Sequence, residues 1–242
     1  MLTDENVQSF RENGYLLPQK QLFSPERFAA LQNIFEEHLA DKGDKLSDEL
    51  DTPHFRDRRL LDFLLSDEVL DVVEPLVGPD IALWTSHFIS KEPKTGRATP
   101  WHEDSAFWEG RLSEYDRIVT VWLALSPSTS ANGCMRVIPG THHNGFSEYR
   151  PTDMTQQTFH AEIVEVDESK AVDFELQPGE YSLHDGRIMH GARANTSDIR
   201  RTGYTMRYFP ASVKVMPVEA NEGWKLWLAR GHDFAGNTYE ER

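Results

Sequence analysis

The stretch Trp101-His102-Glu103-Asp104 places a histidine and a carboxylate two residues apart. On an extended segment such residues point to the same face, so His102 and Asp104 can bind one ion while Glu103 points away. A second histidine must come from a neighbouring strand, and His190 lies 86 residues after Asp104. Two imidazoles and one carboxylate can occupy one face of an octahedral Fe(II) and leave the opposite face open. The stretch therefore predicts paired strands that carry a non-haem iron site.

Arg201 lies eleven residues beyond His190 and extends this pattern. A guanidinium binds a carboxylate through two parallel charge-assisted hydrogen bonds and stays charged at any working pH. We therefore expect Arg201 to hold the far end of 2-oxoglutarate, a dicarboxylate cosubstrate that chelates iron at its other end.

Helix-like and strand-like patterns divide the chain near residue 80. Three helices are expected in the first part, beginning after the capping residues Thr3, Ser24 and Ser66. The second part has short β-prone runs separated by turn residues, which is typical of a sandwich or barrel. These runs are Ile81–Ser90, Arg117–Ser126, Met135–Ile138, Val172–Leu176 and Gly203–Phe209. The order predicts helices packed on a β core.

A length of 242 residues predicts one domain, because single β-rich domains commonly reach this size. We expect a mostly helical part over residues 1–80, the β core over 81–210 and a C-terminal extension over 211–242. Gly145–Lys170 is expected to form a long loop over one end of the core, and such loops often carry function. Trp224–Arg230 is expected to pack back on the core, and the sequence leaves the oligomeric state open.

Charge and composition exclude several kinds of partner. The formal net charge of −15 repels polyanions, which argues against binding to nucleic acid. Cys134 is the only cysteine, so no intrachain disulfide forms and a reducing compartment is expected. The N-terminus lacks the pattern of a secretory signal, and no stretch reaches the roughly 18 apolar residues of a membrane span. These features predict a cytoplasmic protein with no membrane partner.

Four motifs in a fixed order give the chain a resemblance to a known family. They are Trp101–Asp104, Val121–Leu125, Asn132–His142 and Met189–Asn195, the last followed by Arg201. From about Leu2 to Pro210 the chain resembles the phytanoyl-CoA dioxygenase family of Fe(II)- and 2-oxoglutarate-dependent oxygenases. The resemblance implies a mainly β fold, a double-stranded β-helix of the jelly-roll, cupin-like type with packed N-terminal helices. It also favours His190 over His184 as the distal iron ligand.

The resemblance implies roles for individual residues. The set that would bind Fe(II) and form the catalytic centre, where dioxygen reacts, is His102, Asp104 and His190. Arg201 would pair with the distal carboxylate of 2-oxoglutarate, and Trp122 and Thr85 would line the pocket of this cosubstrate. Many relatives carry a small hydroxylated residue where this chain has Ala192, so one hydrogen bond to the cosubstrate is not expected here. The intact Asp104 favours oxygen insertion, because halogenating members of the wider superfamily have Ala or Gly at that position.

Five further residues flank the metal motifs and are candidates for contact with substrate, although large aromatic side chains also fill the cores of β-sandwiches. They are His87, Trp101, Phe107, Trp108 and Arg193. On the last predicted strand, Arg207 shares a face with Arg201. Two alternatives remain for Arg207, a place beside the cosubstrate or an ion pair inside the barrel.

The leading hypothesis is an Fe(II)- and 2-oxoglutarate-dependent dioxygenase that hydroxylates a small organic metabolite and releases succinate and CO2. Desaturation and ring closure stay open as outcomes of the same chemistry. Two other hypotheses are a noncatalytic jelly-roll protein that keeps a metal or an organic acid as a ligand, and an oxygenase that acts on a protein. The complete ligand set favours the enzyme, and the sequence identifies neither its substrate nor a coenzyme A thioester.

Overall fold

The computed structural model describes residues 2–242. The three predicted helix starts are confirmed by α1 (Asp4–Asn13), α2 (Pro25–Ala40) and α4 (Asp67–Val77). Thr3 and Asn6 form a capping box at the start of α1, and the hydroxyl of Ser24 accepts a hydrogen bond from the backbone N–H of Arg27 at the start of α2. Gly14 ends α1 with a φ of 80°, a left-handed conformation that favours glycine.

The N-terminal part also holds elements that the sequence did not predict. They are β1 (Tyr15–Leu16), β2 (Leu50–Asp51), α3 (Leu61–Leu64) and the 3₁₀ helices Pro53–Phe55 and Arg58–Leu60. β1 pairs with β10 and β2 pairs with β3, so both strands join the large sheet of the core. Strands this short carry too few residues to show a period of two.

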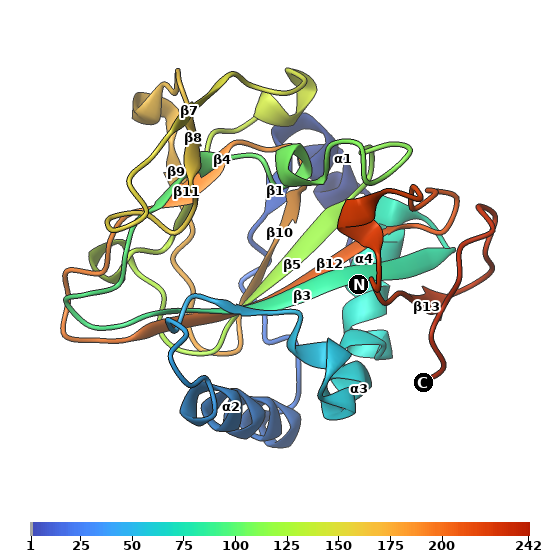
Figure 1. Cartoon of the computed structure of the whole chain (residues 1–242), viewed down its shortest axis with the longest axis horizontal. Helices are drawn as coiled ribbons and strands as arrows, with labels where there is room; N and C mark the ends of the chain where they lie inside the picture. The colour runs from blue at the N-terminus through green and yellow to red at the C-terminus, as the bar shows by residue number, and fades with distance from the viewer. Residues whose placement is uncertain (1) are drawn as a thin grey trace.

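The large sheet has seven antiparallel strands in the order β1-β10-β5-β12-β3-β13, with β2 beside β3. The other members are β3 (Ile81–Lys91), β5 (Val119–Ala124), β10 (Tyr181–Asp185), β12 (Arg201–Pro210) and β13 (Trp227–Arg230). Figure 1 shows α2 and α3 on one side of this sheet and β4 and β11 on the other. Pairing of β13 with β3 confirms that the Trp224–Arg230 segment packs back on the core.

The central strand β12 lies between β5 and β3, and every residue of it is buried. Successive side chains of a strand point to opposite faces. One face carries Tyr204, Met206 and Tyr208, which belong to the hydrophobic core shared with the helices. Tyr204 also stacks on Phe88 of β3 with ring centroids 4.2 Å apart. Since β12 is buried on both sides, the polar residues of its other face, Arg201, Thr205 and Arg207, must lie inside the protein.

A smaller antiparallel sheet faces the large one. Its order is β4-β11-β6-β9, with β4 (Thr99–His102), β11 (His190–Ala192), β6 (Met135–Val137) and β9 (Val172–Asp173). The two sheets share an apolar layer that includes Trp122 and Ala124 of β5 with Met135 and Val137 of β6. Two antiparallel sheets packed face to face, with helices on the outer side of one, confirm the predicted jelly-roll architecture.

The Gly145–Lys170 segment differs from the predicted loop, because it contains a two-stranded antiparallel sheet of β7 (Tyr149–Pro151) and β8 (Ala161–Ile163). Each strand has three residues, so sequence periodicity carries no signal for this hairpin. In Figure 1 the hairpin lies next to β4. It therefore lies close to the strand that carries the His-x-Asp motif.

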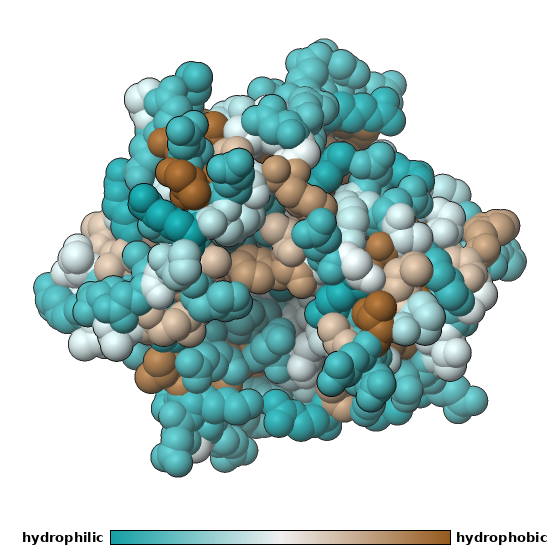
Figure 2. Space-filling view, turned by 45° about the horizontal axis from the view of Figure 1, so that its top comes forward, coloured by the Kyte–Doolittle hydropathy of each residue, from teal (hydrophilic) through white to brown (hydrophobic). Residues whose placement is uncertain are grey.

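The face drawn in Figure 2 is mostly hydrophilic, with apolar side chains gathered in separate patches. Within residues 2–242, no helix combines the length and the apolar character that crossing a membrane would require. Cys134 is buried, and burial raises the pKa of its thiol to about 11. The thiol is therefore protonated at neutral pH, and the side chain packs in the protein interior.

Candidate active site

The two predicted histidines meet across a pair of strands. β4 and β11 are antiparallel neighbours, and His102 and His190 are directly paired residues. Glu103 keeps extended backbone angles, with φ −108° and ψ 131°, before a 3₁₀ helix begins at Asp104. The alternation expected for the His-x-Asp stretch is therefore preserved, and Asp104 turns to the same side as His102.

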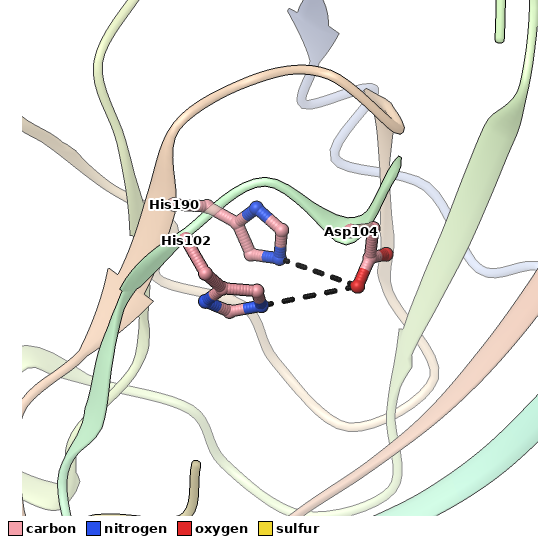
Figure 3. A group of neighbouring side chains, drawn as sticks. All are labelled: His102, Asp104 and His190. Carbon is pink, nitrogen blue, oxygen red and sulfur yellow. Dashed lines mark ion pairs between the residues drawn. The ribbon is translucent and has the colours of Figure 1, made fainter. Parts of the chain in front are cut away.

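The three side chains form one compact group in which all ligand atoms lie within 4.8 Å of one another. The Nε2 atoms of His102 and His190 lie 3.8 Å and 4.0 Å from the same oxygen of Asp104, Oδ1. Figure 3 shows both rings turned toward that oxygen. All three residues are buried, with exposed fractions of 2%, 6% and 5% for His102, His190 and Asp104.

Backbone contacts select the tautomer of each histidine. Nδ1 of His102 lies 2.8 Å from the carbonyl oxygen of Pro100, and Nδ1 of His190 lies 2.9 Å from that of Ile188. Each Nδ1–H donates to its carbonyl, so each Nε2 keeps a free lone pair directed at the centre of the group. Burial is the main cause that lowers the pKa of both rings, which are therefore neutral as metal ligation requires.

Asp104 has a different electrostatic environment. Burial by itself raises the pKa of this carboxyl, but the guanidinium of Arg207 holds the pKa well below its usual range. The Arg207 Nε atom donates to Asp104 Oδ2 at 2.8 Å. The ion pair inside the barrel, one of the two alternatives that the sequence left open for Arg207, is observed. Two neutral imidazoles and one ionised carboxylate are the donor set that non-haem Fe(II) prefers.

Glu103 faces away from the metal group, as predicted, and binds the β7 segment. It is fully buried, and its carboxylate accepts hydrogen bonds from the hydroxyls of Ser147 and Tyr149, each at 2.5 Å. The backbone N–H of Glu103 donates to Tyr149 Oη at 2.9 Å. Glu103, which lies between His102 and Asp104 in the sequence, therefore holds the Gly145–Lys170 segment beside the site through these hydrogen bonds.

A cavity of about 50 Å³ extends from the metal group between the two sheets. It is lined by His87, Ile89, Thr99, His102, Trp122, Met135, Phe159, His184, His190, Gly191, Ala192, Arg201, Thr205 and Arg207. This volume is below the roughly 300 Å³ usual for small-molecule pockets, so a ligand would have to displace some of these side chains.

Arg201 lies in this cavity with an exposed fraction of only 2%. Within residues 2–242 no carboxylate is among the groups that influence its charge, and its Nε atom has no hydrogen-bond partner there. Burial lowers the pKa of this guanidinium to about 10, so it stays positively charged at neutral pH. A buried charge without a partner is costly. Arg201 therefore fits an anionic ligand that the chain itself does not provide.

Trp122 supports Arg201. The guanidinium carbon lies 4.6 Å from the centre of the Trp122 ring, in the range of a cation–π contact. Gly203 makes room for this ring, because a Cβ atom at position 203 would lie 2.5 Å from Trp122 Cε2 and 2.6 Å from Cη2. The indole can pack this close to β12 only because this position has no side chain.

The structure separates the other predicted pocket and substrate residues into two groups. His87 lines the cavity, and the Phe107 ring lies 5.7 Å from the His102 ring. Thr85 of β3 lies opposite Arg207 of β12 in the sheet, and not opposite Arg201. Thr85 does not line the cavity. Trp108 packs in an apolar cluster beside the site.

Trp101 and Arg193, two of the five candidates for contact with substrate, lie away from the cavity. Trp101 alternates with His102 on β4, and the guanidinium of Arg136 lies 5.3 Å from its ring on the outer side of the small sheet. The Arg193 side chain is 57% exposed and lies 3.8 Å from Asp173. Proximity in sequence to the metal motifs did not reveal which side of the sheet each residue faces.

Phe159 and His184 also line the cavity. Phe159 comes from the Gly145–Lys170 segment, and its ring lies 4.7 Å from that of His102 and 5.1 Å from that of Phe107. His184, the less favoured candidate for the distal ligand, is 1% exposed and lies 3.9 Å from Asp104 Oδ2, outside the compact group. Neither of its ring nitrogens has a hydrogen-bond partner within residues 2–242. No local pattern in the sequence indicated that Phe159 would reach the site.

Comparison with known proteins places this chain in a family. Residues 10–203 match the family model described as phytanoyl-CoA dioxygenase (PhyH). The chain belongs to this family. The phytanoyl-CoA dioxygenase domain-containing protein 1 homolog of Caenorhabditis elegans is 27% identical over 188 residues, which cover 72% of this chain and 65% of the relative. The matches to the proteins of the same description from Caenorhabditis briggsae and Dictyostelium discoideum cover 44% and 58% of the length of those relatives. The chain therefore spans less than two thirds of the length of these PhyH relatives.

Solved structures of PhyH-like enzymes share the fold. The non-haem monooxygenase ThoJ is 26% identical, with a TM-score of 0.80 over 98% of this chain and 87% of the other. EvdO2 from Micromonospora carbonacea var. aurantiaca, solved as a complex with 2-oxoglutarate, is 21% identical, with a TM-score of 0.72 over 93% and 97% of the two chains. The expected family and jelly-roll fold are both confirmed.

Proposed function

We propose that this PhyH-family chain is an Fe(II)- and 2-oxoglutarate-dependent dioxygenase. The observation that carries the proposal is the buried, unpaired Arg201 in the same cavity as the neutral His102 and His190, which form one compact group with the ionised Asp104. A metal site and an anion site that share one cavity fit a cosubstrate with a chelating end and a free carboxylate. The 2-oxoglutarate complex of the structurally similar EvdO2 supports this interpretation.

Each residue would have a defined task. The Nε2 atoms of His102 and His190 and one oxygen of Asp104 would hold Fe(II), while Arg201 would bind the distal carboxylate of 2-oxoglutarate through two hydrogen bonds. The Trp122 ring keeps the guanidinium in place for this contact. The metal, the cosubstrate and dioxygen supply the oxidising power, and the protein supplies geometry and a cavity shielded from water.

We further propose that the enzyme hydroxylates a small organic metabolite and releases succinate and CO2. An intact Asp104 supports oxygen insertion. The rings of Phe107 and Phe159 contact each other and lie beside the ring of His102, which favours an apolar portion of the substrate next to the metal site. The narrow cavity favours a small molecule over a protein substrate, and the net charge of −15 argues against nucleic acid.

The test is the visible charge-transfer band that Fe(II) gives when 2-oxoglutarate chelates it. Both would be added to the purified protein without oxygen, and Arg201→Ala would be compared with Arg200→Ala. Arg200 is a matched control, because it is the adjacent residue but pairs with Glu36 on the outer surface. We expect the band in the wild type and in Arg200→Ala, and a much higher 2-oxoglutarate concentration for half-saturation in Arg201→Ala. Absence of the band in the wild type would favour the noncatalytic jelly-roll hypothesis.

A further inference from the structure

Arg207 is held rigidly against Asp104. Its Nε atom donates to Oδ2 at 2.8 Å and its Nη2 atom donates to Oδ1 at 3.2 Å. The remaining nitrogen, Nη1, donates to the hydroxyl of Thr205 at 2.9 Å. The ring of Trp108 lies 5.7 Å from the guanidinium carbon. These contacts leave the buried guanidinium, and hence the carboxylate that it binds, little freedom to rotate.

The two oxygens of Asp104 are used unequally. Oδ2 accepts from Arg207 Nε and, at 3.3 Å, from the hydroxyl of Thr120. A carboxylate oxygen offers about two lone-pair directions, so both directions of Oδ2 are taken. Oδ1 accepts only the longer bond from Arg207 and faces both histidine Nε2 atoms, as Figure 3 shows. Only Oδ1 has a lone pair free for a metal.

We propose that Arg207 is a positioning residue that keeps Asp104 a one-oxygen ligand of iron and so reserves a coordination position for dioxygen. This inference rests on the proposed function. Two imidazole nitrogens, one carboxylate oxygen and two atoms of 2-oxoglutarate would fill five positions of an octahedral ion and would leave one open. If both oxygens of Asp104 bound iron, no position would remain. Arg207 and Thr120 would prevent this, because both donate hydrogen bonds to Oδ2.

A purely structural role for Arg207 makes a different prediction. If Arg207 only neutralised a buried carboxylate, its replacement would lower stability but leave the coordination of a loaded metal unchanged. If Arg207 instead keeps Asp104 a one-oxygen ligand, its replacement must change how readily a small gas molecule binds iron. The two roles are therefore separated by a spectroscopic measurement on the metal.

Nitric oxide is a suitable probe, because it binds the open position of Fe(II) and gives a characteristic EPR signal. Protein loaded with Fe(II) and 2-oxoglutarate under anaerobic conditions would be titrated with nitric oxide. In Arg207→Met we expect the charge-transfer band to persist and the nitrosyl signal to need about 10-fold more nitric oxide or greater, the scale typical of groups that orient a metal ligand. Arg207→Lys, which lacks the planar fork that binds both oxygens of Asp104 in parallel, should show the same direction of change.

Two further variants complete the experiment. Arg136→Met is the matched control, since Arg136 is also buried and paired with carboxylates, Asp173 and Glu168, but lies away from the site. It should bind nitric oxide as the wild type does. If Arg207→Met does not fold, Thr120→Val decides, because it removes one donor to Oδ2 at nearly constant volume and should weaken the nitrosyl signal by a smaller factor.

The outcomes distinguish this inference from the proposed function. A wild-type protein without the charge-transfer band overturns the proposed function and this inference together. A normal band with wild-type nitric oxide affinity in the folded Arg207 variants and in Thr120→Val overturns this inference alone. Weaker nitric oxide binding in these variants, with a persistent band and a normal Arg136→Met control, supports it.

Discussion

Replacement of Gly203 by alanine tests how closely β12 and the Trp122 ring are packed. The added Cβ atom would lie 2.5 Å from Trp122 Cε2 and 2.6 Å from Cη2, so the ring must move. Gly203 does not have a positive φ, and its backbone therefore accepts alanine without strain. Forcing an extra methyl group into a packed core costs about 1–3 kcal/mol, and we expect the free energy of unfolding to fall by that amount.

The same substitution should weaken the binding of 2-oxoglutarate. The displaced ring no longer supports the Arg201 guanidinium, and loss of a cation–π contact costs about 0.5–2 kcal/mol. Since 1.4 kcal/mol is tenfold, the dissociation constant of 2-oxoglutarate should rise about 2- to 30-fold. Denaturant unfolding measures the first effect, and anaerobic titration of the charge-transfer band measures the second.

Gly186→Ala is the control for this prediction. A Cβ atom at position 186 would lie 3.4 Å from Ile118 Cβ and 3.4 Å from Trp108 Cζ3, which is ordinary contact. We expect stability to change by less than about 1 kcal/mol and the affinity for 2-oxoglutarate to stay the same. A Gly203→Ala protein with wild-type stability and affinity would refute the reasoning, because Trp122 would then have room that the structure does not show.

Two further predictions concern the segment beside the site and a buried histidine. Tyr149→Phe removes the hydroxyl that links this segment to Glu103, and amide hydrogen exchange within residues 145–170 should become about tenfold faster or more, with no change elsewhere in the chain as the internal control. Burial lowers the pKa of His54 from 6.5 to about 3, so between these two values the unfolded chain binds a proton that the folded chain excludes. The free energy of unfolding therefore falls as the pH drops from 6.5 to about 3. His54→Gln should reduce the change of the free energy of unfolding with pH by about 1.4 kcal/mol per pH unit between about pH 6 and 4. The same pH dependence in both proteins, measured by denaturant unfolding, would count against this prediction.

Much of the fold was predictable because local signals and tertiary structure agree. Thr3 and Ser24 satisfy backbone N–H groups within one turn of their helices, an effect that depends only on nearby residues. The alternation on β12 likewise follows from the period of two, which assigns Tyr204 and Tyr208 to one face of the strand and Arg201 to the other. Strands of two or three residues, such as β1 and β7, carry no such signal and form only because a neighbouring strand is present.

The sequence by itself determined the chemistry of the candidate site. The types and order of His102, Asp104, His190 and Arg201 follow from the chain, and spacing alone indicated that the first two share a face. Tertiary structure decided which residues complete the site. Arg207 reaches Asp104, Phe159 reaches His102, and Trp101 is turned to the outer side of the small sheet. These contacts depend on how two sheets face each other and on where a distant hairpin lies, and such long-range distances are not encoded in any local pattern of residues.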